Sequence, residues 1–149
     1  NPEGTAAKFT GDWCRTGDLA KRDSDGYLWY QGRADDMFVC GGENIYPSEV
    51  EKMLERHPAV QQACVVGVAD EIKGHKPAAF VILKPHAVAR EDEIKSYALA
   101  NAPPYQHPRW VWFVNELPLA GTNKIDTKRL IQLAEERIAA EQEAAATDT

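Results

Sequence analysis

The stretch GRADDMFVCGGENIYPSEVE, residues 32–51, decides how the rest of the chain is organised. It carries a charged segment at positions 33–36, then a short apolar run, then the pair Gly41 and Gly42. Pro47 follows, and proline suits the first turn of a helix, while the acidic residues after it favour a helix N-terminus. The stretch therefore predicts a short strand, a glycine loop and the start of a helix, preceded by a charged junction between two structural units.

Downstream of Pro47, the apolar pattern predicts alternating helices and strands. Val50, Met53 and Leu54 lie three and four residues apart, which gives one apolar face to a helix that Pro58 ends. The expected elements after this helix are strands at 59–70 and 76–85, a helix at 90–101, a strand at 110–118 and a helix at 126–146. We therefore expect an α+β fold, in which a small sheet of about three strands is flanked by helices.

The first 34 residues predict turns and short strands. The pair Asp25-Gly26 is a turn signal, and aromatic, strand-prone residues follow it. The expected hairpin pairs residues 13–16 with residues 27–31. The opening NPEGTAAKFTGDW has no helix cap and no apolar start, so we expect the sequence to begin within a longer protein.

Composition narrows the class of protein. The chain has 149 residues, 44% of them hydrophobic, which suffices for one domain core or for one domain plus a fragment. Its 17 basic and 23 acidic residues give a net charge of −6, which argues against a general nucleic-acid or membrane-surface binder. No apolar run approaches the roughly 20 residues that span a bilayer. Cys14, Cys40 and Cys64 lack CxxC spacing, and the four histidines lack ligand spacing, so we expect a reduced, cytoplasmic protein without a metal site.

Two charged side chains near the junction are candidate ligand-binding residues. Asp18 follows Gly17 in RTGDL, and a carboxylate at a strand end can accept two hydrogen bonds from a vicinal diol such as ribose. Turn-capping aspartates are very common, so that alternative stays open. Arg33 offers a planar fork that suits a phosphate or a ribose oxygen, and its alternative is a solvated charged turn.

A glycine pair and a loop lysine are the other candidates. Gly41 and Gly42 let a backbone approach a ligand closely or adopt a positive φ, but they form neither GxGxxG nor a P-loop. A plain strand-to-helix turn explains them equally well. Lys124 lies in LPLAGTNKIDTKRL, residues 117–130, where a mobile loop could bring its compact charge to an anionic centre. Taken alone, the position of Lys124 is typical of an exposed loop lysine.

Taken together, these motifs have a recognisable order. WCRTGDL, then DGYL and GRADDMFVCGGENIYPSEVE, then LP and NKID closely resemble the C-terminal portion of adenylate-forming enzymes, the acyl-CoA synthetase or AMP-dependent synthetase and ligase family. The resemblance extends to about residue 135. The segment GGENIYP resembles the acyl- and aryl-CoA ligase branch more than the amino-acid-activating branch.

The resemblance implies a two-step reaction. Such enzymes join a carboxylate to ATP, giving an acyl-adenylate and pyrophosphate, and a thiol such as that of CoA then displaces AMP. Activation of fatty acids is one reaction of this kind. A large N-terminal domain binds ATP and the acid, and a small C-terminal lid rotates between one pose for each half-reaction. ATP and CoA are the implied cofactors, and Mg²⁺ is expected in the full-length enzyme but not on this fragment.

The resemblance also implies roles for individual residues. Asp18 is expected to hold the ribose hydroxyls of the nucleotide, and Arg33 to contact its ribose or phosphate. Asp35 matches the hinge about which the lid turns.

Further roles are implied for the glycine loop and the loop lysine. Gly41 and Gly42 are expected to line the pantetheine channel in the thioester-forming pose. Lys124 matches the catalytic lysine that enters the site in the adenylating pose. The family often has glycine directly before this lysine, whereas this chain has Asn123.

The implied domain division places residues 1–34 in the last hairpin of the N-terminal adenylation domain and residues 35–149 in the mobile lid. The phosphate-binding loop and acid pocket of the family are not in this sequence, so we expect the fragment alone to be inactive. Its own N-terminal domain is the expected partner, and the bared hairpin is expected to favour self-association. Two alternatives remain, a lid of an amino-acid-activating domain that loads a carrier protein and a non-catalytic binding module.

Overall fold

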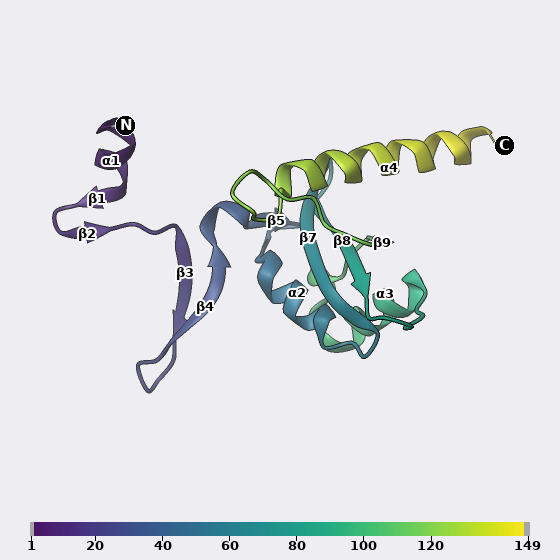
Figure 1. Cartoon of the computed structure of the whole chain (residues 1–149), viewed down its shortest axis with the longest axis horizontal. Helices are drawn as coiled ribbons and strands as arrows, with labels where there is room; N and C mark the ends of the chain where they lie inside the picture. The colour runs from purple at the N-terminus through teal and green to yellow at the C-terminus, as the bar shows by residue number, and fades with distance from the viewer. Residues whose placement is uncertain (1, 148–149) are drawn as a thin grey trace.

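A five-stranded sheet forms the centre of the computed structural model, which describes residues 2–147 (Figure 1). Strands β7 (Val60–Asp70) and β8 (Gly74–Leu83) form its long antiparallel hairpin. Strand β9 (Trp110–Phe113) pairs in parallel with β8. The short strands β5 (Phe38–Cys40) and β6 (Glu43–Ile45) join β8 through the pairing of Cys40 with Gly74. The expected α+β fold is confirmed, and the β5–β6 hairpin widens the expected sheet from about three strands to five.

Helices cover both faces of this sheet. Helices α2 (Pro47–Glu55) and α3 (Glu91–Asn101) pack on one face, and α4 (Thr127–Thr147) lies across the other (Figure 1). A short 3₁₀ turn, η2 (Pro104–Gln106), precedes β9. The three helices predicted from the apolar pattern are therefore present, in the expected order.

The alternation of side chains along β7 and β8 divides the core into two layers. Val65 and Ala79 face α2 and α3, whereas Val66 and Phe80 face α4. Because both faces are covered, these strands read as continuous apolar runs in the sequence. The predicted helix residues Val50, Met53 and Leu54 are all buried, as are Ile94 of α3 and Leu130 and Ala134 of α4.

Helix α2 also covers the free edge of β7. The Glu51 carboxylate accepts a hydrogen bond from the backbone N–H of Val65 at 2.8 Å, and Glu55 accepts one from Ala63 at 3.1 Å. Unpaired N–H groups at a sheet edge otherwise invite pairing with another chain. These two glutamates therefore fix the helix on the sheet and close its edge.

The N-terminal segment projects away from this body (Figure 1). Its main feature is a hairpin of β3 (Asp18–Arg22) and β4 (Leu28–Arg33), which a 3₁₀ turn, η1 (Ala34–Asp36), connects to β5. The predicted pairing of residues 13–16 with 27–31 is wrong. The carboxylate of Asp23 organises the turn by accepting hydrogen bonds from the N–H groups of Asp25 and Tyr27, which sets residues 18–22 opposite 28–33.

The first residues also differ from expectation. They form the short helix α1 (Pro2–Lys8), where only turns and strands were predicted, and the two-residue strands β1 (Phe9–Thr10) and β2 (Trp13–Cys14) pair with each other. Helix α1 buries no residue, so its sequence has no apolar periodicity from which a helix could be predicted.

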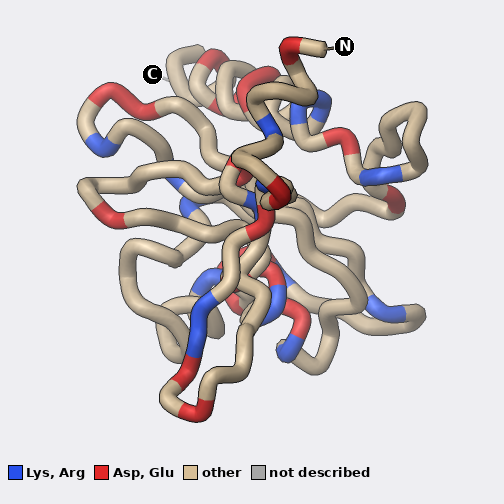
Figure 2. Tube along the Cα trace, turned by 90° about the vertical axis from the view of Figure 1, so that its left-hand side faces the viewer, with Lys and Arg blue, Asp and Glu red and all other residues tan. Residues whose placement is uncertain are grey.

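Large apolar side chains are bare on the N-terminal segment. Trp13 is 82% exposed and Leu28 is 71% exposed, and Tyr27 and Trp29, the neighbours of Leu28 in the chain, are exposed as well. Charges of both signs are interspersed in the view of Figure 2. Within residues 2–147, no helix is both long enough and apolar enough to cross a membrane.

Candidate functional site

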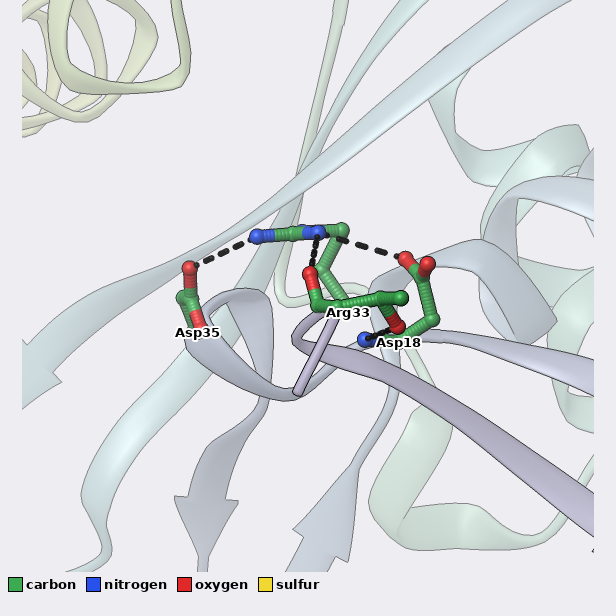
Figure 3. A network of polar contacts seen from close by, with 4 residues as sticks. Asp18, Arg33 and Asp35 are labelled. Carbon is green, nitrogen blue, oxygen red and sulfur yellow. Dashed lines mark hydrogen bonds and ion pairs between the residues drawn. The ribbon is translucent and has the colours of Figure 1, made fainter. Parts of the chain in front are cut away.

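Arg33 is the centre of a polar network at the junction between the hairpin and the sheet (Figure 3). Its Nη1 atom donates to the main-chain oxygen of Thr16 at 2.7 Å and lies 3.3 Å from Oδ1 of Asp18. Its Nη2 atom lies 3.1 Å from Oδ2 of Asp35. The guanidinium fork therefore joins the start of β3, the end of β4 and the turn η1.

Strand pairing brings these residues together. Asp18 and Arg33 are direct partners in the β3–β4 ladder, so their side chains lie at the same end of the hairpin. The chain then enters η1, which carries Asp35 two residues after Arg33. The three residues singled out from separate motifs, Asp18, Arg33 and Asp35, thus form one cluster.

Gly17 allows the guanidinium to lie against the chain. Its φ is +82°, a conformation that a side chain disfavours, and its carbonyl accepts a hydrogen bond from Ala34 N at 2.8 Å. A Cβ atom on Gly17 would lie 2.8 Å from Nη2 of Arg33. Gly17 therefore makes room for the guanidinium of Arg33.

The cluster is open to solvent. The side chains of Arg33, Asp18 and Asp35 are 42%, 45% and 71% exposed. The carboxylates of Asp35 and then Asp18 raise the pKa of Arg33, so the guanidinium stays charged. Ion pairs this exposed add little to stability, since water screens them. The network can therefore exchange partners readily, and a phosphate or ribose could compete for the same donors.

A cleft of about 700 Å³ has residues of this cluster and of the beginning of α4 in its lining. Its lining includes Arg33 and Asp35 of the cluster, Glu51 and Cys64, and Thr127 and Ile131 of α4. The cleft therefore connects the charged junction with the helix that follows the Lys124 loop.

Glu51 is the residue of this cleft that the sequence did not single out as a site. It is partly buried, and desolvation raises the pKa of its carboxyl group. Burial, followed by the charge of Glu51, raises the pKa of the neighbouring Cys64 thiol, which keeps it protonated and unreactive. In the sequence, Glu51 is indistinguishable from the other acidic residues at the start of a helix.

The glycine pair forms the exposed turn between β5 and β6. Gly41 and Gly42 have φ values of +59° and +88°, and nothing lies within 4 Å of the Cβ position of either. The N–H of Gly41 donates to the carbonyl of Lys73 at 2.9 Å, which anchors the turn on the β7–β8 hairpin. The backbone is thus bare on its outer side, and neither glycine lines the cleft beside Arg33.

Lys124 lies in a tight loop just before α4. A bridge between Leu119 and Ile125 closes the loop, and Ala120 N donates to the carbonyl of Lys124 at 2.7 Å. The Lys124 side chain is exposed and makes no hydrogen bond or ion pair with the described residues 2–147. Asn123 has a φ of 59°, and asparagine tolerates this left-handed region better than most residues. It can therefore occupy a position that also suits glycine.

The sequence of the body matches a known domain. Residues 49–124, about half of the chain, match the AMP-binding enzyme C-terminal domain. The chain belongs to this family. The resemblance to the C-terminal part of adenylate-forming enzymes is thereby confirmed.

Relatives of this C-terminal domain are CoA ligases and related synthetases. Benzoate–CoA ligase of Thauera aromatica is 44% identical over 133 residues, which cover 87% of this chain and 25% of the ligase. An anthranilate CoA ligase in complex with anthranoyl-AMP is 41% identical, with a TM-score of 0.75, over 97% of this chain and 28% of that one. An amide bond synthetase from Marinactinospora thermotolerans is 32% identical, with a TM-score of 0.83, over 89% of this chain and 27% of the synthetase.

The chain thus spans about a quarter of the length of these relatives. Within residues 2–147, no group of three or more His, Cys, Asp or Glu side chains is placed to hold a metal ion. Asp18 and Asp35 are each paired with Arg33.

Proposed function

We propose that this chain is the last hairpin and the mobile lid of an ATP-dependent acyl- or aryl-CoA ligase. In this proposal residues 1–34 belong to a large N-terminal adenylation domain, and residues 35–149 form the lid. The observation that carries it is the fork of Arg33, which joins Asp18 on the hairpin to Asp35 at the junction. A nucleotide site and a hinge therefore meet in one cluster.

The nucleotide half of the proposal uses Asp18 and Arg33. The Asp18 carboxylate accepts hydrogen bonds from the two ribose hydroxyls, a geometry that a carboxylate supports well. Arg33 donates to a ribose or phosphate oxygen through its planar fork. Both side chains are a little under half exposed, which supports their availability to a nucleotide.

The hinge half of the proposal uses Asp35. Residues 34–37 connect the β3–β4 hairpin to β5, and the three residues of η1 among them, 34–36, are exposed. Changes of φ and ψ in so short a turn can reorient the lid as a rigid body.

Lys124 serves the first half-reaction. A carboxylate oxygen of the acid attacks the α-phosphorus of ATP, the P–O bond to pyrophosphate breaks, and the acyl-adenylate forms. Two anions approach one another in this step, so a cation between them stabilises the transition state. The cleft that links Arg33 with Thr127, three residues after Lys124, supports the adenylating pose for the arrangement seen here.

Gly41 and Gly42 serve the second half-reaction. The sulfur of CoA attacks the acyl carbon, the bond to AMP breaks, and the thioester forms. The glycine turn would then line the channel through which the pantetheine arm reaches the adenylate. Its exposed outer side supports this role, because a side chain there would narrow the channel.

The proposed setting is the cytoplasm, where the three free cysteines stay reduced.

The test uses the full-length protein and the 149-residue chain side by side. The full-length protein with ATP, Mg²⁺ and a panel of carboxylic acids is expected to exchange pyrophosphate into ATP and to consume free CoA. The chain alone is expected to do neither. Loading of a carrier protein without use of CoA would favour the amino-acid-activating alternative. Exchange by the chain alone, or no exchange by the full-length protein with any acid, would contradict the proposal.

A further inference from the structure

Helix α2 touches strand β4 across the proposed hinge. Ser48, in the first turn of α2, donates a hydrogen bond from Oγ to the main-chain oxygen of Gln31. Four residues later on the same side of the helix, Nζ of Lys52 lies 5.7 Å from the ring centroid of Tyr30. These four residues, together with Gly32, form what we call the α2–β4 contact.

Gly32 permits this close approach. It is buried, its φ is +136°, and a Cβ atom built on it would lie 2.7 Å from Oγ of Ser48. A side chain at this position would be strained at this φ and would displace the Ser48 hydroxyl from the carbonyl of Gln31. A glycine within a strand often marks such an approach of backbone to a neighbour. The α2–β4 contact therefore depends on a close approach of the backbone at Gly32 as well as on side-chain contacts.

The contact joins the two units that the hinge separates. Tyr30, Gln31 and Gly32 precede Asp35 in the chain, whereas Ser48 and Lys52 follow it. Rotation about Asp35 carries α2 with the sheet and leaves β4 with the hairpin, so the hydrogen bond and the cation–π contact must break. The contacts within the body, such as those of Glu51 and Glu55 with β7, are untouched by the same rotation.

We propose that Ser48 and Lys52 hold the lid in the orientation seen here and must let go of β4 before it can turn to the other one. They are positioning residues that act on the equilibrium between two poses. Loss of one hydrogen bond of this kind changes such an equilibrium on the order of fivefold. Linking this pose to adenylation rests on the proposed function, whereas the contact and its effect on orientation do not.

Distance measurement on the 149-residue chain tests this directly. Cys14 is exposed and is replaced by serine, while Cys40 and Cys64 are buried and stay unlabelled. Spin labels are attached at Lys21→Cys on β3 and at Glu135→Cys on α4, both exposed positions. The labelled chain is diluted with an excess of unlabelled chain, so that double electron–electron resonance reports the separation within one molecule even where chains associate.

The variant pair Ser48→Ala with Lys52→Gln is compared with a matched pair, Ser96→Ala with Lys128→Ala, whose side chains are exposed on α3 and α4. We expect one narrow distance distribution in the parent and in the matched pair. In the α2–β4 pair we expect a second, displaced population to grow about fivefold or more. The single variants are measured as well, so that a folding failure of the pair, detected by circular dichroism, leaves the comparison intact.

An unchanged distribution in folded Ser48→Ala and Lys52→Gln proteins would overturn the proposal, and so would an equal change in the matched pair. Because no nucleotide, acid or CoA is present, this outcome is independent of the ligase assignment. In the full-length protein, the same pair is expected to lower the rate of adenylation relative to thioester formation. If the variant pair changes the orientation in the chain but not the ratio of the two rates, the proposed function is contradicted. The proposed role of the α2–β4 contact is still supported in that case.

Discussion

The Nη2 atom of Arg33 lies 3.1 Å from Oδ2 of Asp35, while its Nη1 atom contacts Asp18 from the other side. One guanidinium thus connects the residue proposed to bind the ribose with the residue proposed to act as hinge. Since both ion pairs are exposed, their value lies in the geometry of the junction more than in the stability of the fold.

Replacing Arg33 by lysine tests the fork. A lysine keeps the charge but cannot bond Thr16, Asp18 and Asp35 at once, because its ammonium is a single point charge. We expect the KM for ATP in the full-length protein to rise on the order of tenfold, measured by pyrophosphate exchange. Arg22→Lys, on the same hairpin, is the control and is expected to leave the KM unchanged. An unchanged KM in both variants would remove Arg33 from the nucleotide site.

Gly17→Ala tests the close approach beneath Arg33. A side chain at a φ of +82° is strained by about 1–2 kcal/mol, and its Cβ would also displace the guanidinium. Urea unfolding should show a loss of stability of that size, accompanied by weaker ATP binding in the full-length protein. Gly121→Ala, where nothing lies within 4 Å of the added Cβ, should be close to neutral. Full retention of stability in Gly17→Ala would contradict the geometry.

Glu51 predicts a pH dependence of stability. Because desolvation raises the pKa of this carboxyl above its usual 4.5, the folded chain binds a proton more tightly than the unfolded chain. The contribution of Glu51 to stability is therefore greatest below pH 4.5 and is lost as the pH rises through its folded pKa. Glu51→Gln, whose side-chain oxygen can still accept from Val65, should show a smaller fall in stability over that range.

The measurement is urea unfolding of parent and variant at a series of pH values from 4 upward. Glu135→Gln on the exposed side of α4 is the control and should follow the parent. If the free energy of unfolding falls with pH equally in Glu51→Gln and in the parent, the raised pKa of Glu51 does not contribute to the pH dependence of stability.

The exposed apolar side chains of the N-terminal segment predict self-association of the isolated chain. Trp13 and Leu28 are mostly exposed, and exposed apolar side chains gain free energy when another copy of the chain covers them. We expect light scattering to show a mass above that of a monomer at high concentration, and Trp13→Ser with Leu28→Lys to lower it. A clean monomer at all concentrations would contradict the expectation.

The body of the fold was predictable because its elements are buried in regular patterns. The apolar runs around Val65 and Phe80 are buried on both faces of the sheet, which makes them readable as strands. Val50, Met53 and Leu54 repeat at helical spacing, so the spacing of apolar residues predicted the helix. The N-terminal segment was predicted poorly because nothing there is deeply buried. Residues 18–22 read DLAKR, which has no apolar alternation, and the capping of the turn by Asp23 decides their pairing instead.

The candidate site could be predicted only in part, because it depends on strand register and helix docking that the sequence pattern does not show. The resemblance pointed to Asp18, Arg33 and Asp35, but only the strand register shows that they meet. Ser48, Glu51 and Lys52 were missed because their roles depend on where α2 docks. Gly32 was the one available signal, since an isolated glycine in a strand suggests a close approach.

The most direct test of the central claim separates the two half-reactions in the full-length protein carrying Lys124→Ala, with Lys128→Ala as the matched control. One assay follows adenylate formation from acid and ATP, and the other follows thioester formation from supplied acyl-adenylate and CoA. We predict that Lys124→Ala slows the first about 100- to 1000-fold and leaves the second within a few-fold of the parent. Equal rates for Lys124→Ala and the control in the first assay would contradict the account of this chain as an adenylating lid.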